Sequence, residues 1–547
     1  MAERRKRAEV VIGAAVLALA TALYYAPGLG FDFLLWDDGL FVIDNPRIAP
    51  TPENLLWYAL HPFYDLYTPL PLYSLMADRM LFGLDPVMFH LHNLLLHIAS
   101  AWLLALTLRR FGARCAVAFG AALLWAVQPQ KIESVLWISE RKDVLCGLLV
   151  FASLYAFARA MARNRTPWLA GVLAALAMGA KPAALPLGGV MIVWCWCRYG
   201  GRSGFRRRLA RLAGPLALWL AAVLWAAHVT AETNPGVLER AWAIPLGNLF
   251  RYPLTALLPW EFNPVYPTGT GAWREALPYL LGGAALAAAF VLAARRLGWQ
   301  WRAIAAVLLI AAGTAAPVLG LLRYTDYTFC DRYNYFVSAA VWGAAALLAE
   351  SALRRGFSPR LTAAAGLAFL FFYWFLGWSY LPYWKDDASL FGYALTRPGV
   401  PNLKALEFLL ATASGEDEAA RYEQLAEAVA KNRETYIRQT EERAVRHFEA
   451  FLAGHLAFLR GDYAACQAHY REIAAAGGGD CLFVERAAPV FFHDLAMISL
   501  AEGRLDDARQ MLEAEQRRYE PDSLEYQEAA AQLAEVARQA EQAAGQR

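Results

Sequence analysis

Long apolar stretches separated by short polar segments run through residues 1–400. A helix needs about 20 largely apolar residues to cross a bilayer, and eleven stretches are candidates. The stretches are centred near Leu17, Ala99, Leu123, Phe151, Ala174, Val190, Leu220, Leu286, Leu308, Val341 and Phe371. The pattern therefore predicts an all-α, polytopic membrane protein with about eleven transmembrane helices.

From about Asn402 the pattern changes to that of soluble helices, with apolar residues at i, i+3, i+4 and i+7. Two stretches repeat a helix–turn–helix pattern, with Gly461 and Gly503 in the turns, 42 positions apart. This pattern resembles the tetratricopeptide repeat, whose period is about 34 residues; a small helical bundle is the alternative. We predict a transmembrane domain over residues 1–395 and a helical domain over 396–547 that binds or spaces rather than catalyses.

Arginine placement orients the predicted helices, because short cytoplasmic loops carry an excess of Lys and Arg. Every second loop is basic; the clusters begin at Arg4, Arg109, Arg159, Arg198, Arg295 and Arg354. With a cytoplasmic N-terminus and an odd number of spans, the C-terminal domain is exported. We therefore predict a multi-pass bacterial inner-membrane protein with an uncleaved N-terminal anchor and periplasmic loops 28–88, 129–140 and 229–275.

Composition agrees with a membrane protein and excludes several other classes. Charged residues make up 18% of the chain, below the roughly 25% of a soluble domain. The net charge of +3 does not indicate a nucleic-acid partner. Seven cysteines without a CxxC indicate neither a zinc site nor a redox motif. In an exported domain Cys466 and Cys481 have the option of pairing, which their spacing leaves open.

Two adjacent carboxylates, Asp37 and Asp38, follow the first apolar stretch. Charges close to a bilayer are costly and tend to be functional. The carboxylates have the chemistry to deprotonate an acceptor hydroxyl or to bind a divalent cation. A solvated turn is the structural alternative.

Two further polar clusters lie in segments predicted to be exported. Residues 128–143 form a short loop and the mouth of the next helix; residues 326–335 precede the tenth apolar stretch. The cationic side chains in these clusters are suited to bind a phosphate, because Arg makes bidentate contacts with it. Two structural roles are the alternatives: ion pairs with neighbouring carboxylates, and snorkelling of the charged group to the membrane surface. His90, His92 and His97 near the second stretch favour hydrogen bonding over metal binding.

These motifs, in this order, resemble those of the transmembrane-and-tetratricopeptide O-mannosyltransferase-like proteins of the GT-C superfamily. The resemblance covers residues 8–395 closely and the tail only in kind. The motifs are Trp36-Asp37-Asp38, Tyr67-Thr68-Pro69-Leu70, Phe89-His90-Leu91-His92-Asn93, Leu96-His97, the segment ESVLWISERKDVL from Glu133, Lys181-Pro182, Asp331-Arg332-Tyr333 and Tyr383-Trp384-Lys385-Asp386.

The resemblance implies an inverting transfer of a monosaccharide from a polyprenyl-phosphate donor to a hydroxyl of an exported protein or glycan, next to membrane lipids. It implies that Asp37 or Asp38 activates the acceptor and that Glu133 orients the acceptor or the sugar. Donor-phosphate binding is assigned to Lys131, Arg141, Lys142 and Arg332, and acceptor or sugar binding to His90, His92, Asn93 and Tyr333.

The chain departs from the family pattern at two places. Relatives carry His-Pro-x-His where this chain has Gln128-Pro129-Gln130-Lys131, and tend to have Arg where it has Thr68. No cofactor is firmly predicted, and a divalent cation at Asp37 and Asp38 stays open. Two other functions also stay open: a transferase that modifies a lipid or polysaccharide, and an inactive scaffold that recruits envelope proteins through its tail.

Overall fold

The computed structural model describes most of the chain. The described residues are all except 1, 35, 65, 201–203, 232–241, 267–271, 321–328, 398–402, 412–417, 440–441, 479–483, 485–486, 520–523 and 546–547. The chain forms two compact units, residues 1–386 and 387–547, whereas the sequence prediction places a boundary after residue 395. Residues 326–328 of the third polar cluster, and Cys481, lie outside the described residues.

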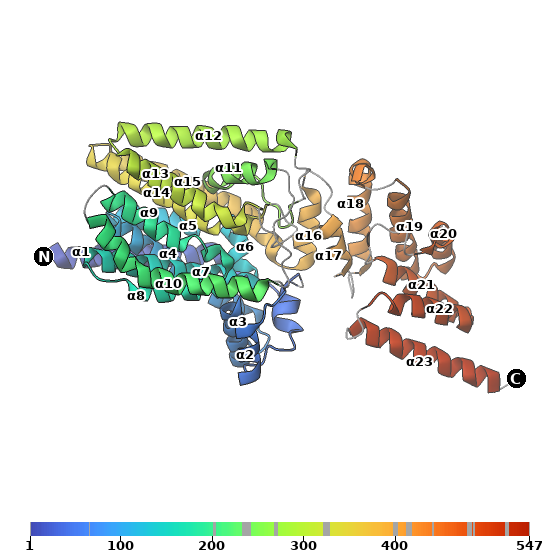
Figure 1. Ribbon diagram of the computed structural model, residues 1–547. Helices are drawn as coiled ribbons and strands as arrows, with labels where there is room; N and C mark the ends of the chain where they lie inside the picture. Colours follow the sequence, from blue (N-terminus) through green and yellow to red (C-terminus); the bar gives the residue numbers. More distant parts are fainter. Residues whose placement is uncertain are drawn as a thin grey trace. The chain divides into compact units, whose positions relative to one another are not determined.

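The first unit is a bundle of helices (Figure 1). Its long helices are α1 (Ala2–Tyr25), α4 (Pro86–Arg110), α7 (Arg141–Ala162), α10 (Gly204–Thr230), α12 (Trp273–Arg296), α13 (Trp301–Ala315), α14 (Asn334–Arg354) and α15 (Pro359–Tyr380). Its shorter helices are α2 (Pro52–Leu60), α3 (Pro69–Phe82), α5 (Cys115–Ala126), α6 (Lys131–Leu136), α8 (Trp168–Met178), α9 (Leu187–Tyr199) and α11 (Ala243–Leu257).

The predicted class of an all-α, polytopic membrane protein is confirmed. Within the described part of the chain, eight helical segments are long and apolar enough to cross a membrane, and no β-strand forms. All eleven predicted centres fall inside helices, but α5, α8 and α9 have only 12, 11 and 13 residues. These three are shorter than the roughly 20 residues a bilayer requires. Eight of the eleven predicted spans therefore meet the length requirement among the described residues, and the count of eleven stays a prediction.

Contacts between loops show that the helices alternate in direction. The loops that carry the arginine clusters meet at one end of the bundle. There Arg114 Nε lies 3.0 Å from Glu350, Arg354 donates to the Gly112 carbonyl at 2.8 Å, Arg355 donates to the Arg296 carbonyl at 2.9 Å, and Arg208 donates to the Met161 carbonyl at 2.6 Å.

The loops predicted to be exported meet at the other end, where α2 and α3 also lie (Figure 1). Lys181, between α8 and α9, lies 2.8 Å from Glu140 at the start of α7. The Asp32 amide donates to the Lys385 carbonyl at 3.1 Å, which joins the segments after α1 and α15. Segments that are hundreds of residues apart in sequence therefore share one end of the bundle.

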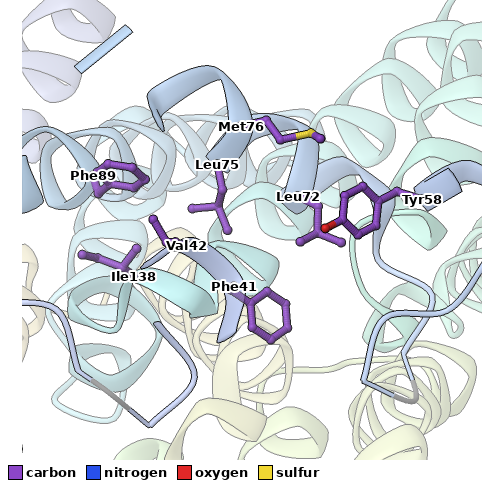
Figure 2. Packing of buried hydrophobic residues seen from close by; sticks show 8 residues of the cluster. All are labelled: Phe41, Val42, Tyr58, Leu72, Leu75, Met76, Phe89 and Ile138. Atoms are coloured by element: carbon purple, nitrogen blue, oxygen red, sulfur yellow. The ribbon is translucent and has the colours of Figure 1, made fainter. Parts of the chain in front are cut away.

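An apolar cluster fixes the segment between α1 and α4 to the bundle (Figure 2). The cluster consists of Phe41, Val42, Tyr58, Leu72, Leu75, Met76, Phe89 and Ile138. Phe41 and Val42 belong to a π-helical turn, Gly39–Ile43, directly after the two adjacent carboxylates. Ile138 belongs to the short turn Ile138–Glu140 that precedes α7. Burial of these side chains therefore holds the carboxylates against the start of α7.

The second unit consists of α16 (Asp387–Thr396), α17 (Leu403–Ala411), α18 (Glu418–Gln439), α19 (Glu442–Leu459), α20 (Tyr463–Ala475), α21 (Ala487–Ala501), α22 (Leu505–Gln516) and α23 (Leu524–Gly545). Helices α19 and α20, like α21 and α22, pack as consecutive pairs. Gly461 and Gly503 make the turns at φ +74° and +75°, where glycine avoids the steric cost of a side chain. The assignment to tetratricopeptide repeats stays a prediction, and Cys466 is buried.

The close crossing of α4, α7 and α14 gives a test of this packing. A Cβ on Gly147 of α7 would lie 2.6 Å from the Tyr335 ring and 3.3 Å from Ser100 Oγ. We expect Gly147→Ala to destabilise the protein by about 1–3 kcal/mol, the usual cost of overpacking. Gly366→Ala in α15 is the control, because a Cβ there meets nothing within 4 Å. Thermal unfolding in detergent measures both, and equal melting temperatures would contradict the described crossing.

Candidate active site

A polar cavity lies at the end of the bundle where the segments predicted to be exported meet. It holds about 1170 Å³ of empty space, part of which is open to solvent. Three cations and two carboxylates line it: Lys142, Lys181, Arg332, Asp37 and Glu140. Trp36 and Trp137 also line it, stacked with ring centroids 4.1 Å apart. The cavity therefore combines an excess of positive charge with a flat aromatic wall.

Glu140 connects the three cations. Its side chain lies 2.8 Å from Lys181 Nζ, 3.6 Å from Lys142 Nζ and 3.4 Å from Arg332 Nε. Glu140 is 3% exposed, so these contacts form in a largely dehydrated place, where charges interact more strongly than in water. One carboxylate thus holds three cations around a single cavity.

Arg332 and Lys181 each have a second buried carboxylate behind them. Arg332 binds Glu133 through its guanidinium, and its backbone amide donates to Glu133 at 2.9 Å. Burial raises the pKa of Glu133, while Arg332 opposes this rise. Lys181 Nζ lies 2.8 Å from Asp143. These outer carboxylates fix the cations in position without lining the cavity.

The adjacent carboxylates Asp37 and Asp38 have different environments. Asp37 lines the cavity, its side chain is 28% exposed, and it lies 3.6 Å from Lys142 Nζ. Asp38 is fully buried. One Asp38 oxygen accepts from the amide and hydroxyl of Ser139, and the other accepts from the Leu34 amide at 2.9 Å.

A cation held jointly by these two carboxylates does not fit this arrangement, because protein donors already occupy both oxygens of Asp38. Among the described residues, no group of three or more His, Cys, Asp or Glu side chains has the arrangement of a metal site. Asp37 is therefore the open carboxylate of the pair, and Asp38 supports the loop that carries it.

Arg141 was assigned to the donor phosphate from the sequence, but the structure places it behind the cavity. It is fully buried and lies 2.6 Å from Asp78, and it also binds Asn93 and donates to the Phe89 carbonyl at 3.0 Å. His92 lies 2.8 Å from the same Asp78. Arg141 therefore ties α7 to α3 and α4.

Two of the residues predicted to bind the acceptor or sugar, His90 and Asn93, lie in the interior. His90 is buried. Asn93 donates to the Val135 and Trp137 carbonyls, both at 3.3 Å. Of the four residues predicted to bind the acceptor or sugar, Tyr333 lines the cavity; His92 is partly exposed beside Asp78.

Lys131 is also buried and does not line the cavity. Its Nζ donates to the Gln128 side chain at 3.2 Å and to the Asn334 carbonyl at 3.1 Å. Gln130 donates to Asp331 at 2.7 Å. Burial lowers the pKa of Lys131 to about 7. This network joins the loop before α6 to the helical turn Asp331–Tyr333 that carries Arg332.

An apolar groove adjoins the cavity and shares Ala183 with it. The groove holds about 880 Å³ of empty space, and α4, α7, α9, α13 and α14 supply its walls. Apart from Thr107 and Thr314, its lining side chains are apolar. A ligand with a charged head and a long apolar chain therefore matches the two spaces.

Sequence reasoning did not assign Lys181 or Glu140 a role in binding. Lys181 was noticed only as part of a Lys-Pro motif. The available signal was a cation next to a proline between two apolar stretches, where an unpaired charge is costly. The structure supplies its partners, Glu140 and Asp143.

Comparison with known proteins gives relatives of one kind. Protein O-mannosyl-transferase TMTC1 of Mus musculus is 33% identical over 160 residues, 27% of this chain and 17% of that protein. TMTC1 of Homo sapiens is 31% identical over 27% of this chain and 18% of its own length. Protein O-mannosyl-transferase Tmtc3 of Drosophila melanogaster is 25% identical over 29% of this chain and 22% of its own length. The chain thus spans about a fifth of the length of these relatives.

No protein-family model matches the chain. Among solved structures, the crystal structure of ArnT from Cupriavidus metallidurans bound to undecaprenyl phosphate is similar at a TM-score of 0.39 and 16% identity, covering 94% of this chain and 81% of that one. The sequence matches confirm the resemblance predicted from the motifs: this chain is similar to the protein O-mannosyl-transferases.

The buried state of Asp38 predicts a pH-dependent stability. Burial raises the pKa of Asp38 to about 7, although bonds from Ser139 and Leu34 oppose this rise. The unfolded carboxyl has a pKa near 4. Between these two pKa values the folded protein binds more protons than the unfolded protein does. The contribution of Asp38 to the free energy of unfolding is therefore fully present below about pH 4 and is lost as the pH rises through 7.

We expect Asp38→Asn to remove this part of the pH dependence. The free energy of unfolding should then fall less steeply between pH 4 and 7, by up to about 1.4 kcal/mol per pH unit. Denaturation in detergent at several pH values measures the slope. Parallel slopes for wild type and Asp38→Asn would show that Asp38 is ionised over this range.

Proposed function

We propose that this chain is a membrane glycosyltransferase that moves a monosaccharide from a polyprenyl-phosphate donor to a hydroxyl of an exported protein, with inversion. The observation that carries the proposal is the cavity itself. Three cations surround one space, a half-buried carboxylate lies at its edge, and an apolar groove opens from it. Similarity to protein O-mannosyl-transferases supports the same reaction class.

Lys142, Lys181 and Arg332 would bind the donor phosphate. Arg suits bidentate contact with phosphate, and Lys supplies a compact charge. The polyprenyl chain would lie in the apolar groove beyond Ala183. Preorganised cations stabilise charge that develops on the leaving phosphate, which is the largest single contribution in many enzymes. Glu140 positions these cations.

Asp37 would act as the general base. It takes the proton of the acceptor hydroxyl while the hydroxyl oxygen attacks the anomeric carbon of the sugar. The bond from that carbon to the phosphate oxygen breaks, and both of its electrons leave with the polyprenyl phosphate. Attack from the side opposite the phosphate inverts the configuration at the anomeric carbon. Asp38 is a positioning residue, because its contacts are with the protein.

The topology follows as part of the proposal. The end with the cavity faces the periplasm of a bacterial inner membrane, and the arginine-rich end faces the cytoplasm. Residues 396–547 present or select the exported acceptor through a tetratricopeptide-like surface. An inactive scaffold is disfavoured, because buried charges are costly and packing alone does not require three cations around an open cavity.

The first test of the function compares glycan masses on envelope proteins and glycolipids. Asp37→Asn keeps the size of the side chain but removes the base, so we expect product to fall 10²–10⁴-fold. Asp32→Asn is the matched control, because Asp32 is an exposed carboxylate in the same segment. Cells lacking the chain give the baseline. A mass that disappears on deletion but persists with Asp37→Asn would leave Asp37 without a chemical role and favour the scaffold.

The second test concerns the donor site. Lys142 contacts Asp37 and Glu140 and lines the cavity. We expect Lys142→Gln to weaken binding of a short-chain polyprenyl phosphate to the purified protein about tenfold, or about 1.4 kcal/mol. Arg163→Gln, at an exposed position in a loop of the arginine-rich end, should leave the affinity unchanged. Equal affinities for wild type and Lys142→Gln would remove Lys142 from the phosphate site.

A further inference from the structure

The cavity has a third wall, made of apolar side chains, to which the proposed function assigns no role. Leu40, Phe41, Tyr64 and Leu66 line it on the side of the first exported segment; we call these four residues the apolar lip. Leu40 is 39% exposed and Tyr64 is 57% exposed. Large apolar side chains that stay open to solvent beside a polar site commonly mark a binding surface.

Contacts place the lip next to Asp37 and next to Lys142, one of the three cations assigned to the donor phosphate. Lys142 Nζ lies 3.6 Å from Asp37 and 4.5 Å from the centre of the Phe41 ring. The Tyr64 ring lies beyond, with its centre 6.3 Å from that of Phe41. An acceptor whose hydroxyl reaches Asp37 therefore has its neighbouring atoms over the lip.

The backbone holds Tyr64 in an uncommon conformation. Its φ is +44°, a value that non-glycine residues rarely adopt. Phe63 and Leu66 close the turn through reciprocal backbone hydrogen bonds of 2.9 and 3.1 Å. The Tyr64 ring also packs edge-on against Phe63, with centres 4.7 Å apart. Such strain persists where the surrounding structure enforces it and is concentrated at functional sites.

The chemistry of the lip narrows the class of acceptor. Its four side chains carry one polar group, the Tyr64 hydroxyl, whereas a sugar acceptor needs several placed hydrogen-bond partners. A lipid acceptor needs a groove for its chain. The groove beside Ala183 is assigned to the donor, and the second apolar cavity, between α11, α12, α13 and α14, shares no lining residue with the polar cavity in the described structure.

We infer that the apolar lip is the acceptor subsite, and that the acceptor is a polypeptide with an apolar or aromatic side chain next to the hydroxyl that receives the sugar. This inference rests on the proposed function and adds to it the acceptor subsite and the kind of side chain beside the modified hydroxyl. Tyr64 supplies the contact that distinguishes acceptors, while Asp37 performs the proton transfer.

The test maps modified hydroxyl residues on envelope proteins by tandem mass spectrometry. Tyr64→Gly removes the ring but suits the positive φ, so the turn is retained. Tyr64→Phe keeps the ring. Leu56→Ser is the matched control: Leu56 is 60% exposed on α2 and does not line the cavity. Affinity of each purified protein for a short-chain polyprenyl phosphate reports the donor site separately.

We expect wild-type sites to have an apolar residue beside the modified hydroxyl. Occupancy of these sites should fall roughly tenfold in Tyr64→Gly, the scale at which an apolar pocket discriminates. Tyr64→Phe and Leu56→Ser should keep wild-type occupancy, and the donor affinity of Tyr64→Gly should not change.

Other outcomes overturn the inference in distinguishable ways. Unchanged occupancy in Tyr64→Gly, or sites without apolar neighbours, removes the lip from acceptor recognition while the transferase stands. If the sugar mass that depends on this protein appears only on a glycolipid, the acceptor is a lipid and not a polypeptide. If no sugar mass on envelope proteins or glycolipids depends on the presence of this protein or on Asp37, the proposed function is wrong as well.

Discussion

The site depends on one constraint: a single buried carboxylate, Glu140, compensates three cations at the end of a membrane-protein bundle. Cations repel one another, and each loses hydration energy on burial. The contacts of 2.8 to 3.6 Å from Glu140 to Lys181, Lys142 and Arg332 offset part of this cost. Asp37, Glu133 and Asp143 each contact one of these cations as well, whereas Glu140 is the carboxylate that contacts all three. In the proposed reaction, the donor phosphate would bind the cations on the side that faces the cavity.

The neighbouring residues Asp37 and Asp38 have different environments because the chain turns between them. Asp38 lies against the Ser139 turn and accepts hydrogen bonds from it, which fixes the start of α7 relative to the segment that follows α1. Asp37 remains on the cavity side with 28% of its side chain exposed. In the proposed reaction, Asp37 would have the access to substrate that a base needs, and Asp38 would supply the rigid support of the loop that carries it.

Sequence reasoning predicted the fold class because a bilayer sets a strong length and polarity requirement on each helix. It also identified the segments that meet at the cavity. It did not predict which of Arg141 and Lys142 lines the cavity. Successive side chains of a helix point about 100° apart, and the sequence does not show which direction faces the cavity. The structure shows that α7 begins at Arg141, with Arg141 toward Asp78 and Lys142 toward Asp37. Lys181 was missed for a related reason, since its partners lie about 40 residues away in sequence.

Gln128 and Lys131 lie where the sequence departs from the pattern that it resembles, and the structure shows contacts for them that the sequence alone did not provide. Lys131 Nζ is held by Gln128 and by the Asn334 carbonyl, and Gln130 reaches Asp331. These bonds do not reach the cavity, but they fix both sides of Arg332 in the turn Asp331–Tyr333. In the proposed reaction, the Arg332 guanidinium would stabilise the leaving phosphate, and reorganisation of its backbone would reduce this electrostatic effect. Under that proposal, the two amides and the buried lysine would act on the chemistry through the position of Arg332.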